Sequence, residues 1–390
     1  MIRSKEESLS DDPESKRRKE EEGTTHASVR EKTEEKATDM EKVDDNTNAY
    51  LYDVSIIVPV HNEEKYLEDC FKGIESTSFQ GRLEISIFND RSTDRSKEII
   101  EEWTARFHDR GWGCVYSENA TPTGGCGYAK NRAIQQSHGE YLCFQDADDI
   151  MYPDRITKEL EVLRQHPDSI VGTRFERTPQ NSMRHYTEWL NNLQDGDLMK
   201  YQYREVIIIQ PTWMLSRKQF DRVGGYRERG SDEAPFPEDL DFYHRHLDLG
   251  GQLHIVPEVL VVYRMHPNNA CSKVPRRTIL RVKLQALERR VLDGLDHFSI
   301  WGGGRDGRNF LNDLSEANRT KVVAFGDVDT KKIGTHYVNP LTHVDVPVVH
   351  FSELVPPVVC CVALGRTNGV FEANLESMHW TCGKDYWYFN

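Results

Sequence analysis

The sequence predicts an α/β fold, with a mostly parallel sheet covered by helices on both faces and a smaller α/β unit after it. Two observations predict this fold. Short runs rich in β-branched residues alternate with segments of helical apolar spacing, and several of these runs end directly in acids or glycines. Alternating strands and helices favour a parallel sheet, which binds ligands at the carboxyl ends of its strands. The 390 residues are enough for two domains.

The first segment, residues 1–48, consists mostly of charged residues, serine and threonine, without apolar periodicity. Such a segment buries too little apolar surface to offset the entropy of ordering, so we expect a disordered charged tail. Its basic run, Lys16 to Lys19, resembles a nuclear-import patch, although basic residues embedded among acids are more often solvated charge.

The first domain is expected over residues 49–272. It begins with VSIIVPV, a run typical of a buried strand, and Leu67, Phe71 and Ile74 in the next segment have helical spacing. The expected elements that follow are a strand at 83–90, an amphipathic helix beginning near STDRS, a helix at 128–137 and a strand at 140–149 that ends in acids.

A basic linker helix is expected at 273–296, and a Rossmann-like accessory domain at 297–390. The basic residues of the linker could meet a phosphate backbone or form a solvated face; they are Lys273, Arg276, Arg277, Arg281, Lys283, Arg289 and Arg290. In the accessory domain, Gly302 to Gly307 fit GxGxxG and Asp327 lies about 20 residues on, as in dinucleotide sites. Because the unit is short and lacks visible hydride-transfer residues, we expect it to help hold the acceptor without bound NAD.

Composition sets further expectations. A formal net charge of −14 argues against binding nucleic acid through bulk charge, but a local basic face remains compatible with it. The eight cysteines show no CxxC pair or zinc-like spacing, so we expect reduced, mostly buried thiols. No apolar run approaches the roughly 18 residues of a membrane span, and the start has no apolar signal region. We therefore expect a cytoplasmic protein, with a nuclear fraction if the import patch acts.

The strongest chemical signal is Asp146-Ala147-Asp148-Asp149 at the end of the strand YLCFQ. Three carboxylates leaving one buried strand repel each other unless a cation or hydrogen-bond donors neutralise them. Oxygen ligands of this kind suit Mg²⁺ or Mn²⁺. The alternative is a solvated turn that caps the next helix.

The acids belong to an ordered series of motifs: SIIVPVHNE (55–63), NDRSTDRS (89–96), GGCGYAKNRA (124–133), DADD (146–149) and PEDLDFYHR (237–245). In this order, the motifs resemble the family 2 glycosyltransferases over roughly residues 52–270. The resemblance implies the GT-A fold of nucleotide-diphospho-sugar transferases and a metal-dependent hexosyltransferase.

The resemblance also implies roles for residues that would bind the nucleotide and the metal. Pro59, His61 and Glu63 match the turn that lines the nucleotide pocket, and Asp90 matches the acid that hydrogen-bonds the uracil. Further matches are Lys130 near the diphosphate, where the family often has arginine, Asp146 on the ribose or the metal, and Asp148 on the metal.

Other matched positions concern the reaction and the donor sugar. Asp239 is expected to be the general base, with Glu238 as the fallback, and direct displacement with one base implies inversion. The remaining matches are Trp213 and Gly225 beside the donor sugar, Arg264 on a phosphate, and His266 as a third metal ligand. Trp213 could equally be a core aromatic, and a lone histidine is more often structural.

The catalytic segment followed by WGGGRDGRNF and AFGDVDTKKIG is similar to family members that glycosylate a tRNA nucleoside. That similarity implies UDP-galactose as the donor and the cyclopentenediol hydroxyl of queuosine, in the anticodon of tRNA-Tyr, as the acceptor. Two alternatives stay open. One is a transferase that moves N-acetylglucosamine from its UDP-sugar to a glycan, and the other is an NAD-dependent sugar-nucleotide oxidoreductase or a non-catalytic binder.

Overall fold

The computed structural model describes residues 50–120, 124–204, 206–228, 235–340, 342–365 and 367–389. The predicted tail at 1–48 and its basic run therefore lie outside the described residues. Among those that are described, no helix combines the length and apolar character that crossing a bilayer requires.

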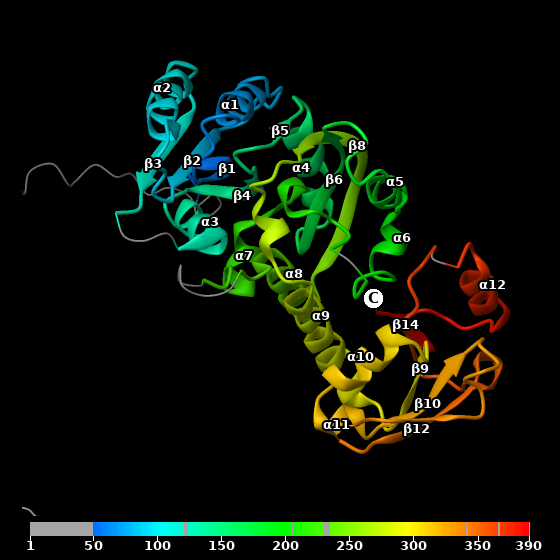
Figure 1. Cartoon of the computed structure of the whole chain (residues 1–390). Helices are drawn as coiled ribbons and strands as arrows, with labels where there is room; N and C mark the ends of the chain where they lie inside the picture. Colours follow the sequence, from blue (N-terminus) through cyan, green and yellow to red (C-terminus); the bar gives the residue numbers. More distant parts are fainter. Residues whose placement is uncertain are drawn as a thin grey trace, which may run out of the picture. The chain divides into compact units, whose positions relative to one another are not determined.

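The first sheet has eight strands in the order β3-β2-β1-β4-β7-β6-β8-β5 (Figure 1). The strands are β1 (Tyr52–Val60), β2 (Leu83–Asn89), β3 (Gly113–Glu118), β4 (Gly139–Phe144), β5 (Ile150–Met151), β6 (Ser169–Thr178), β7 (Met214–Ser216) and β8 (Gln252–Arg264). Strands β3, β2, β1 and β4 run parallel, as do β6 and β8. The short strand β7 is antiparallel to both β4 and β6, and β5 is antiparallel to β8.

Helices cover both faces of this sheet, as predicted. They are α1 (Leu67–Glu75), α2 (Ser96–Asp109), α3 (Gly125–Gln135), α4 (Arg155–Gln165), α5 (Arg184–Asn192), α6 (Asp195–Leu198), α7 (Arg217–Val223) and α8 (Glu238–Asp248). Side chains of α1, α2 and α4 share one core with Ile56 and Val58 of β1, whereas α3, α5, α7 and α8 share the other with Ile57. This division follows from the alternation of side chains along a strand.

The second sheet has the order β11-β12-β10-β9-β13-β14, and all its pairs are parallel except β11 with β12. Its strands are β9 (Phe298–Trp301), β10 (Val322–Asp327), β11 (His336–Val338), β12 (Asp345–His350), β13 (Val358–Cys360) and β14 (Tyr386–Tyr388). The accompanying helices are α10 (Arg305–Asp313), α11 (Glu316–Arg319) and α12 (Val370–Ser377).

The predicted linker helix is α9 (Arg276–Arg290), and it is more than a connector. Val282 packs in a core of the first sheet, whereas Leu284 and Leu287 pack with Phe298 and Ile300 in the core of the second. Helix α9 therefore contributes to two cores, which rules out a sharp boundary on either side of it.

Of the cysteines whose side chains are described, four are buried, namely Cys70, Cys143, Cys360 and Cys361, and none is in a disulfide. This agrees with the expectation of reduced, mostly buried thiols. Cys126 is exposed at the start of α3.

Candidate functional site

Acidic side chains from two neighbouring strands meet at one edge of the first sheet. Strands β1 and β4 are parallel neighbours, so the residues that follow them lie at the same edge. Glu63 follows β1, and Asp146, Asp148 and Asp149 follow β4. Strand β4 ends at Phe144, so the three aspartates lie in the turn beyond it and not in the predicted strand at 140–149.

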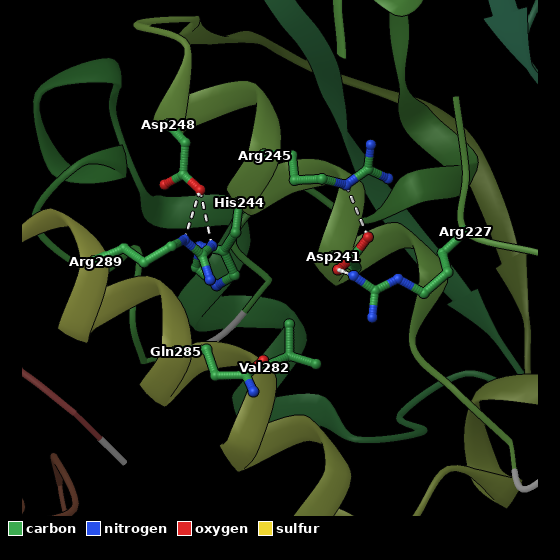
Figure 2. Close-up of a pocket in the computed structure, with 8 residues that line it drawn as sticks. All are labelled: Arg227, Asp241, His244, Arg245, Asp248, Val282, Gln285 and Arg289. Atoms are coloured by element: carbon green, nitrogen blue, oxygen red, sulfur yellow. Dashed lines mark hydrogen bonds and ion pairs between the residues drawn. The ribbon is translucent and has the colours of Figure 1, made fainter. Parts of the chain in front are cut away.

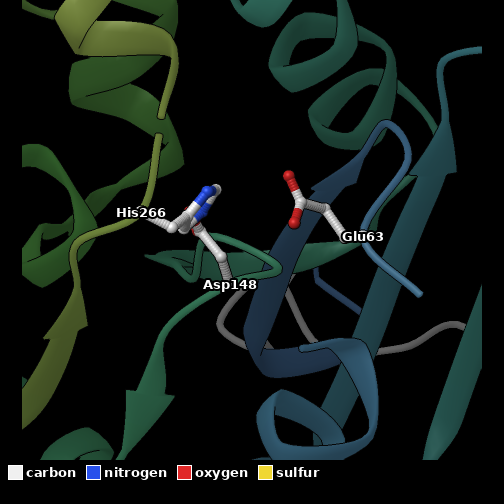
Figure 3. Close-up of side chains that lie close together, drawn as sticks. All are labelled: Glu63, Asp148 and His266. Atoms are coloured by element: carbon white, nitrogen blue, oxygen red, sulfur yellow. The ribbon is translucent and has the colours of Figure 1, made fainter. Parts of the chain in front are cut away.

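Two groups of side chains at this edge have metal-ligand geometry. The candidate ligand atoms of Glu63, Asp148 and His266 lie within 4.8 Å of one another, and so do those of Asp146, Asp148 and Asp149. Figure 3 shows Glu63 and the pair Asp148–His266 pointing toward one another from separate segments. Asp148 belongs to both groups, which makes it the centre of the cluster.

Asp148 is held in place by the segment after β8. His266 Nε2 lies 2.8 Å from Asp148 Oδ2, and Asn269 Nδ2 donates to the same oxygen at 3.1 Å. The His266 ring packs against Tyr66 with their centroids 4.7 Å apart. The histidine is thus fixed beside the predicted metal ligand, where it can orient that carboxylate or bind a cation with it.

Asp149 carries a buried oxygen without a protein partner. Its side chain is fully buried, and Oδ1 accepts the backbone N–H of Arg264 at 2.7 Å. Its other oxygen, Oδ2, has no hydrogen-bond partner among the described residues. Burial, with the charges of Asp148 and Asp146, raises the pKa of Asp149 well above its usual range. The sequence interpretation gave Asp149 no role of its own.

The electrostatics of the cluster favour a cation. Burial raises the pKa of Asp146 to about 6; the charge of Lys130 opposes this rise and that of Asp148 adds to it. Burial and the charges of Asp148 and Asp146 raise the pKa of Glu63 to about 8. Such carboxyls are destabilised as anions unless positive charge reaches them. The candidate ligands are carboxylate oxygens and one imidazole nitrogen, a set that fits a hard divalent cation.

A second cluster lies at the first turn of α8. Lys130 of α3 is 5% exposed, and its Nζ lies 3.1 Å from Glu238 Oε1 and 5.6 Å from the centre of the Tyr226 ring. Asp239 follows Glu238, and its Oδ1 accepts the N–H of Leu240 at 2.7 Å. Burial and the charge of Glu238 raise the pKa of Asp239 to about 6, against the charge of Lys130. Lys130 forms its ion pair with Glu238. The assignment of Asp239 as the base stays a prediction.

The two clusters interact. Against the effect of burial, the charges of Glu238 and Asp146 raise the pKa of Lys130. The charges of Glu238 and Asp239 in turn contribute to the raised pKa of Asp146. The predicted metal-binding acids and the predicted base therefore lie within electrostatic reach of each other. Residues 90 to 100 positions apart in the chain are brought together here by the ends of β4 and α8.

The predicted uracil contact, Asp90, is 2% exposed. Its carboxylate accepts the N–H groups of Gly124 and Gly125, at 3.1 and 3.2 Å, and Nδ2 of Asn119 at 2.9 Å. Asp90 therefore organises the start of α3, and a uracil N–H could bond to Asp90 only by sharing a carboxylate oxygen with these donors. His61 Nδ1 lies 2.7 Å from the backbone oxygen of Asp90, which ties the turn after β1 to the turn after β2.

Pro59 lies in β1 beside Phe88 of β2, one residue before the strand ends. Gly225 has a φ of +74°, a conformation that glycine adopts without strain, and its carbonyl accepts from Arg245. Contacts of both residues with a donor stay predictions.

Trp213 requires a correction. It is fully buried, its Nε1 donates to the Ile208 carbonyl at 2.7 Å, and its ring packs near Phe242 and Tyr243. A side chain without exposed surface offers nothing to a donor sugar, so the prediction that Trp213 borders the sugar is wrong. Its packing is that of a core aromatic.

Arg264 lies beside the cluster but is already paired. Its guanidinium lies 3.2 Å from Asp69 on α1 and 4.7 Å from the centre of the Tyr66 ring. Its role as a phosphate contact stays a prediction, and ligand binding there would compete with Asp69.

The basic face predicted on α9 is largely used within the protein. Lys283 is 2% exposed and donates to the Arg204 carbonyl. Arg277 pairs with Asp313, and Arg289 and Arg290 both pair with Asp248. Folding thus places carboxylates opposite Arg277, Arg289 and Arg290, and contact of the linker with a phosphate backbone stays a prediction.

The glycine loop of the second sheet has a packing role. A Cβ on Gly307 would lie 1.9 Å from the Gly302 carbonyl oxygen, so α10 approaches the loop closely only because residue 307 is glycine. Asp327, the acid that a dinucleotide site would use for ribose, is paired with Lys332 at 2.9 Å.

Comparison with known proteins finds glycosyltransferases. Residues 55–224 match the family model described as Glycosyl transferase family 2. An uncharacterized glycosyltransferase of Bacillus subtilis, EpsJ, is 25% identical over 263 residues, covering 66% of this chain and 73% of that protein. Glycosyltransferase GlyG of Streptococcus pneumoniae is 28% identical over 263 residues, covering 62% of this chain and 82% of its own.

Solved structures are similar over a comparable part of the chain. S. aureus TarS 1-349 in complex with UDP-GlcNAc has a TM-score of 0.48 and 16% identity, covering 68% of this chain and 71% of that one. A mannosyltransferase of Pyrobaculum calidifontis, in complex with GDP-Man and Mn²⁺, has a TM-score of 0.48 and 19% identity. The similarity covers 63% of this chain and 66% of that one.

The family match covers most of β1 and the turns that carry Glu63, Asp146 and Asp148, whereas Glu238, Asp239 and His266 lie beyond its end. Residues 55–224 therefore form a glycosyltransferase domain of family 2, and the chain is a glycosyltransferase.

Proposed function

We propose that this chain transfers galactose from UDP-galactose to the cyclopentenediol hydroxyl of queuosine in the anticodon of tRNA-Tyr, with inversion at the sugar. The observation that supports transfer is the cluster of carboxylates after β1 and β4, one of which, Asp146, lies within electrostatic reach of the base candidate Asp239. The specific donor and acceptor rest on the resemblance of the whole chain to queuosine-tRNA galactosyltransferase. The proposed acceptor places the activity in the cytoplasm and, where tRNA is nuclear, in the nucleus.

In this proposal Asp239 takes the proton of the acceptor hydroxyl while the hydroxyl oxygen forms a bond to the anomeric carbon. The bond from that carbon to the diphosphate breaks on the opposite side, and UDP leaves with the electron pair. A raised pKa suits Asp239 to this task, since a base is most effective when its pKa approaches the working pH. Lys130 keeps Glu238 neutralised beside it.

Glu63, Asp146, Asp148 and His266 would hold a divalent cation, with Asp149 supporting the turn. When bound, such a cation, Mn²⁺ or Mg²⁺, supplies Lewis-acid neutralisation of the diphosphate leaving group. His61 and Asp90 tie together the two turns that would face the nucleotide. Pro59, Gly225 and Arg264 are proposed to line the donor pocket.

The test is to incubate the full chain with Mn²⁺, UDP-galactose or UDP-N-acetylglucosamine, and tRNA with or without queuosine. Nucleoside masses are then measured after digestion. We expect a hexose on queuosine only, from UDP-galactose only. Transfer of N-acetylglucosamine would contradict the donor assignment. Metal-dependent binding of UDP without transfer to tRNA would leave the family assignment intact and overturn the acceptor.

A further inference from the structure

A cavity of about 250 Å³ lies between α8 and α9, on the part of α8 beyond the base candidate. Figure 2 shows charged side chains of both helices and Arg227 turned toward it. Its lining residues are Arg227, Asp241, His244, Arg245, Asp248, Val282, Gln285 and Arg289. None of them belongs to the metal-binding cluster or to the acid pair Glu238 and Asp239.

Two aspartates in this cavity each hold two arginines. Asp241 lies 3.3 Å from Arg227 and 2.9 Å from Arg245. Asp248 lies 2.8 Å from Arg289 and 3.2 Å from Arg290. Each group of one carboxylate and two guanidiniums keeps a net charge of about +1 at neutral pH, because arginine stays protonated. The carboxylates thus fix the guanidiniums in place without cancelling their charge.

His244 adds a buried donor. Its side chain is 1% exposed, and its Nδ1 lies 2.7 Å from Arg290 Nη2, which has only hydrogens to give. Nδ1 must therefore accept, so the proton of the neutral ring is on Nε2. Among the described residues, Nε2 has no hydrogen-bond partner. Burial and the charges of Arg290, Lys283 and Arg289 lower the pKa of His244 well below its usual range, which keeps the ring neutral.

We infer that this cavity binds a phosphate group of the acceptor RNA, close to the nucleoside that receives the sugar. Guanidiniums are the preferred partners of phosphate oxygens, and those of Arg227, Arg245 and Arg289 line this cavity. Along α8, Arg245 is six residues beyond Asp239, about 9 Å at 1.5 Å per residue. A phosphate next to the reacting nucleotide can reach over such a distance. The inference rests on the proposed RNA acceptor.

The test compares variants of the full chain that each remove one positive charge. Arg289→Gln and Arg227→Gln alter the two groups from exposed positions, whereas Arg281→Gln is an exposed control on α9 that does not line the cavity. Binding of a labelled tRNA-Tyr anticodon stem-loop is measured by fluorescence anisotropy over a range of KCl concentrations. Circular dichroism verifies that each variant is folded.

We expect Arg289→Gln and Arg227→Gln to weaken stem-loop binding roughly threefold or more and to lower the slope of log K against log salt by about 0.7. Arg281→Gln should weaken binding less than either. Equal losses for all three variants would show diffuse charge and overturn the inference, as would no loss for the cavity variants.

A second arm separates RNA from free phosphate. Inorganic phosphate alone is titrated while the melting temperature is followed. If phosphate stabilises the wild type but not Arg289→Gln, while the two proteins bind the stem-loop equally, the cavity is a site for the free anion and the RNA inference is wrong.

Transfer to queuosine by the wild type, measured in parallel, keeps this inference apart from the proposed function. If the wild type modifies queuosine but the cavity variants show no selective loss of stem-loop binding, the cavity inference is wrong and the proposed function stands. Selective loss of RNA binding without modified queuosine supports an RNA phosphate site and overturns the acceptor nucleoside.

Discussion

Each of the two sheets ends a strand in acids, but the two sites differ in what neutralises them. After β4, the carboxyls of Asp146 and Asp149 have raised pKa values because they are buried beside other carboxylates. At the end of β10, Asp327 accepts the N–H groups of Val328 and Asp329, both at 2.9 Å, and Nζ of Lys332 at 2.9 Å. Burial favours a higher pKa there too, but Lys332 and the N–H donors outweigh it and lower the pKa of Asp327.

The comparison shows that acids after a strand do not by themselves mark a functional site. What distinguishes the first site is that several carboxylates crowd together there, and one buried oxygen, Asp149 Oδ2, has no partner among the described residues. At the second site, the carboxylate of Asp327 has its hydrogen-bond partners within the protein. Whether acids at the end of a strand form a functional site therefore depends on the hydrogen-bond and ion-pair partners of the carboxylates as well as on their position.

The largest effect is expected at the base. Asp239→Asn removes the proton acceptor while keeping the shape, so kcat should fall by roughly 10²–10⁴-fold with metal-supported UDP binding retained. Steady-state kinetics together with calorimetric titration of UDP measure both. Glu238→Gln is the matched variant. If Asp239→Asn stays active and Glu238→Gln does not, the base is Glu238.

A smaller effect, on Mn²⁺ binding, is expected from substitution of the candidate metal ligand His266. His266→Ala should weaken Mn²⁺ binding roughly 10–100-fold, since it removes a candidate ligand as well as a partner that orients Asp148. Asn269→Ala removes only the second donor to the same Asp148 oxygen and should cost less. Mn²⁺ binding is followed by electron paramagnetic resonance. Equal losses would mean that His266 only orients Asp148.

The pH dependence of stability should separate the two acidic sites. A carboxyl with a raised folded pKa binds its proton more tightly folded than unfolded, so it favours folding at low pH and disfavours it once ionised. For Asp146 and Asp239 this loss falls between about pH 4 and 6, and for Glu63 it extends to about pH 8. Without metal, the melting temperature should therefore fall by at least roughly 2–4 °C from pH 5 to 8.

Excess Mn²⁺ should restore most of that loss at pH 8 and have little effect at pH 5, where protons compete for the same oxygens. Differential scanning fluorimetry at both pH values gives the answer. A Mn²⁺ shift that is equal at the two pH values would contradict the assignment of these carboxyls to the metal group.

The smallest effect is expected at the second sheet. Asp327→Asn removes one partner of Lys332 and should lower the free energy of unfolding by about 1 kcal/mol or less, with sugar transfer unaffected. Urea unfolding and the transfer assay measure the two quantities. Loss of transfer would show that the satisfied acid also takes part in function.

The sequence predicted the first sheet well where strands are long and apolar. Strands β1, β2 and β4 lie where their β-branched runs predicted them, and Leu240, Tyr243 and Leu247 are the buried side of α8 as expected. Strand β7 was missed because three residues carry no periodicity. It is defined only by pairing with β4 and β6.

The candidate site was predictable residue by residue but not as an arrangement. The motif order indicated Asp148 and His266, yet these residues are 118 positions apart and only the fold brings them within 2.8 Å. Glu63 was assigned to the nucleotide, and its place beside Asp148 follows from the parallel pairing of β1 with β4. The contacts of Lys283, Arg289 and Arg290 could likewise not be predicted, since their partners come from other segments.

The central claim is that the carboxylates after β1 and β4 bind the nucleotide through a divalent cation. Calorimetric titration of UDP into wild type, Asp148→Asn and Asp327→Asn, each with Mn²⁺ and with EDTA, tests it most directly. We predict that UDP binds wild type and Asp327→Asn only with Mn²⁺, and that Asp148→Asn gives no binding under either condition. Tight binding of UDP by Asp148→Asn, or by the wild type in EDTA, would contradict the claim.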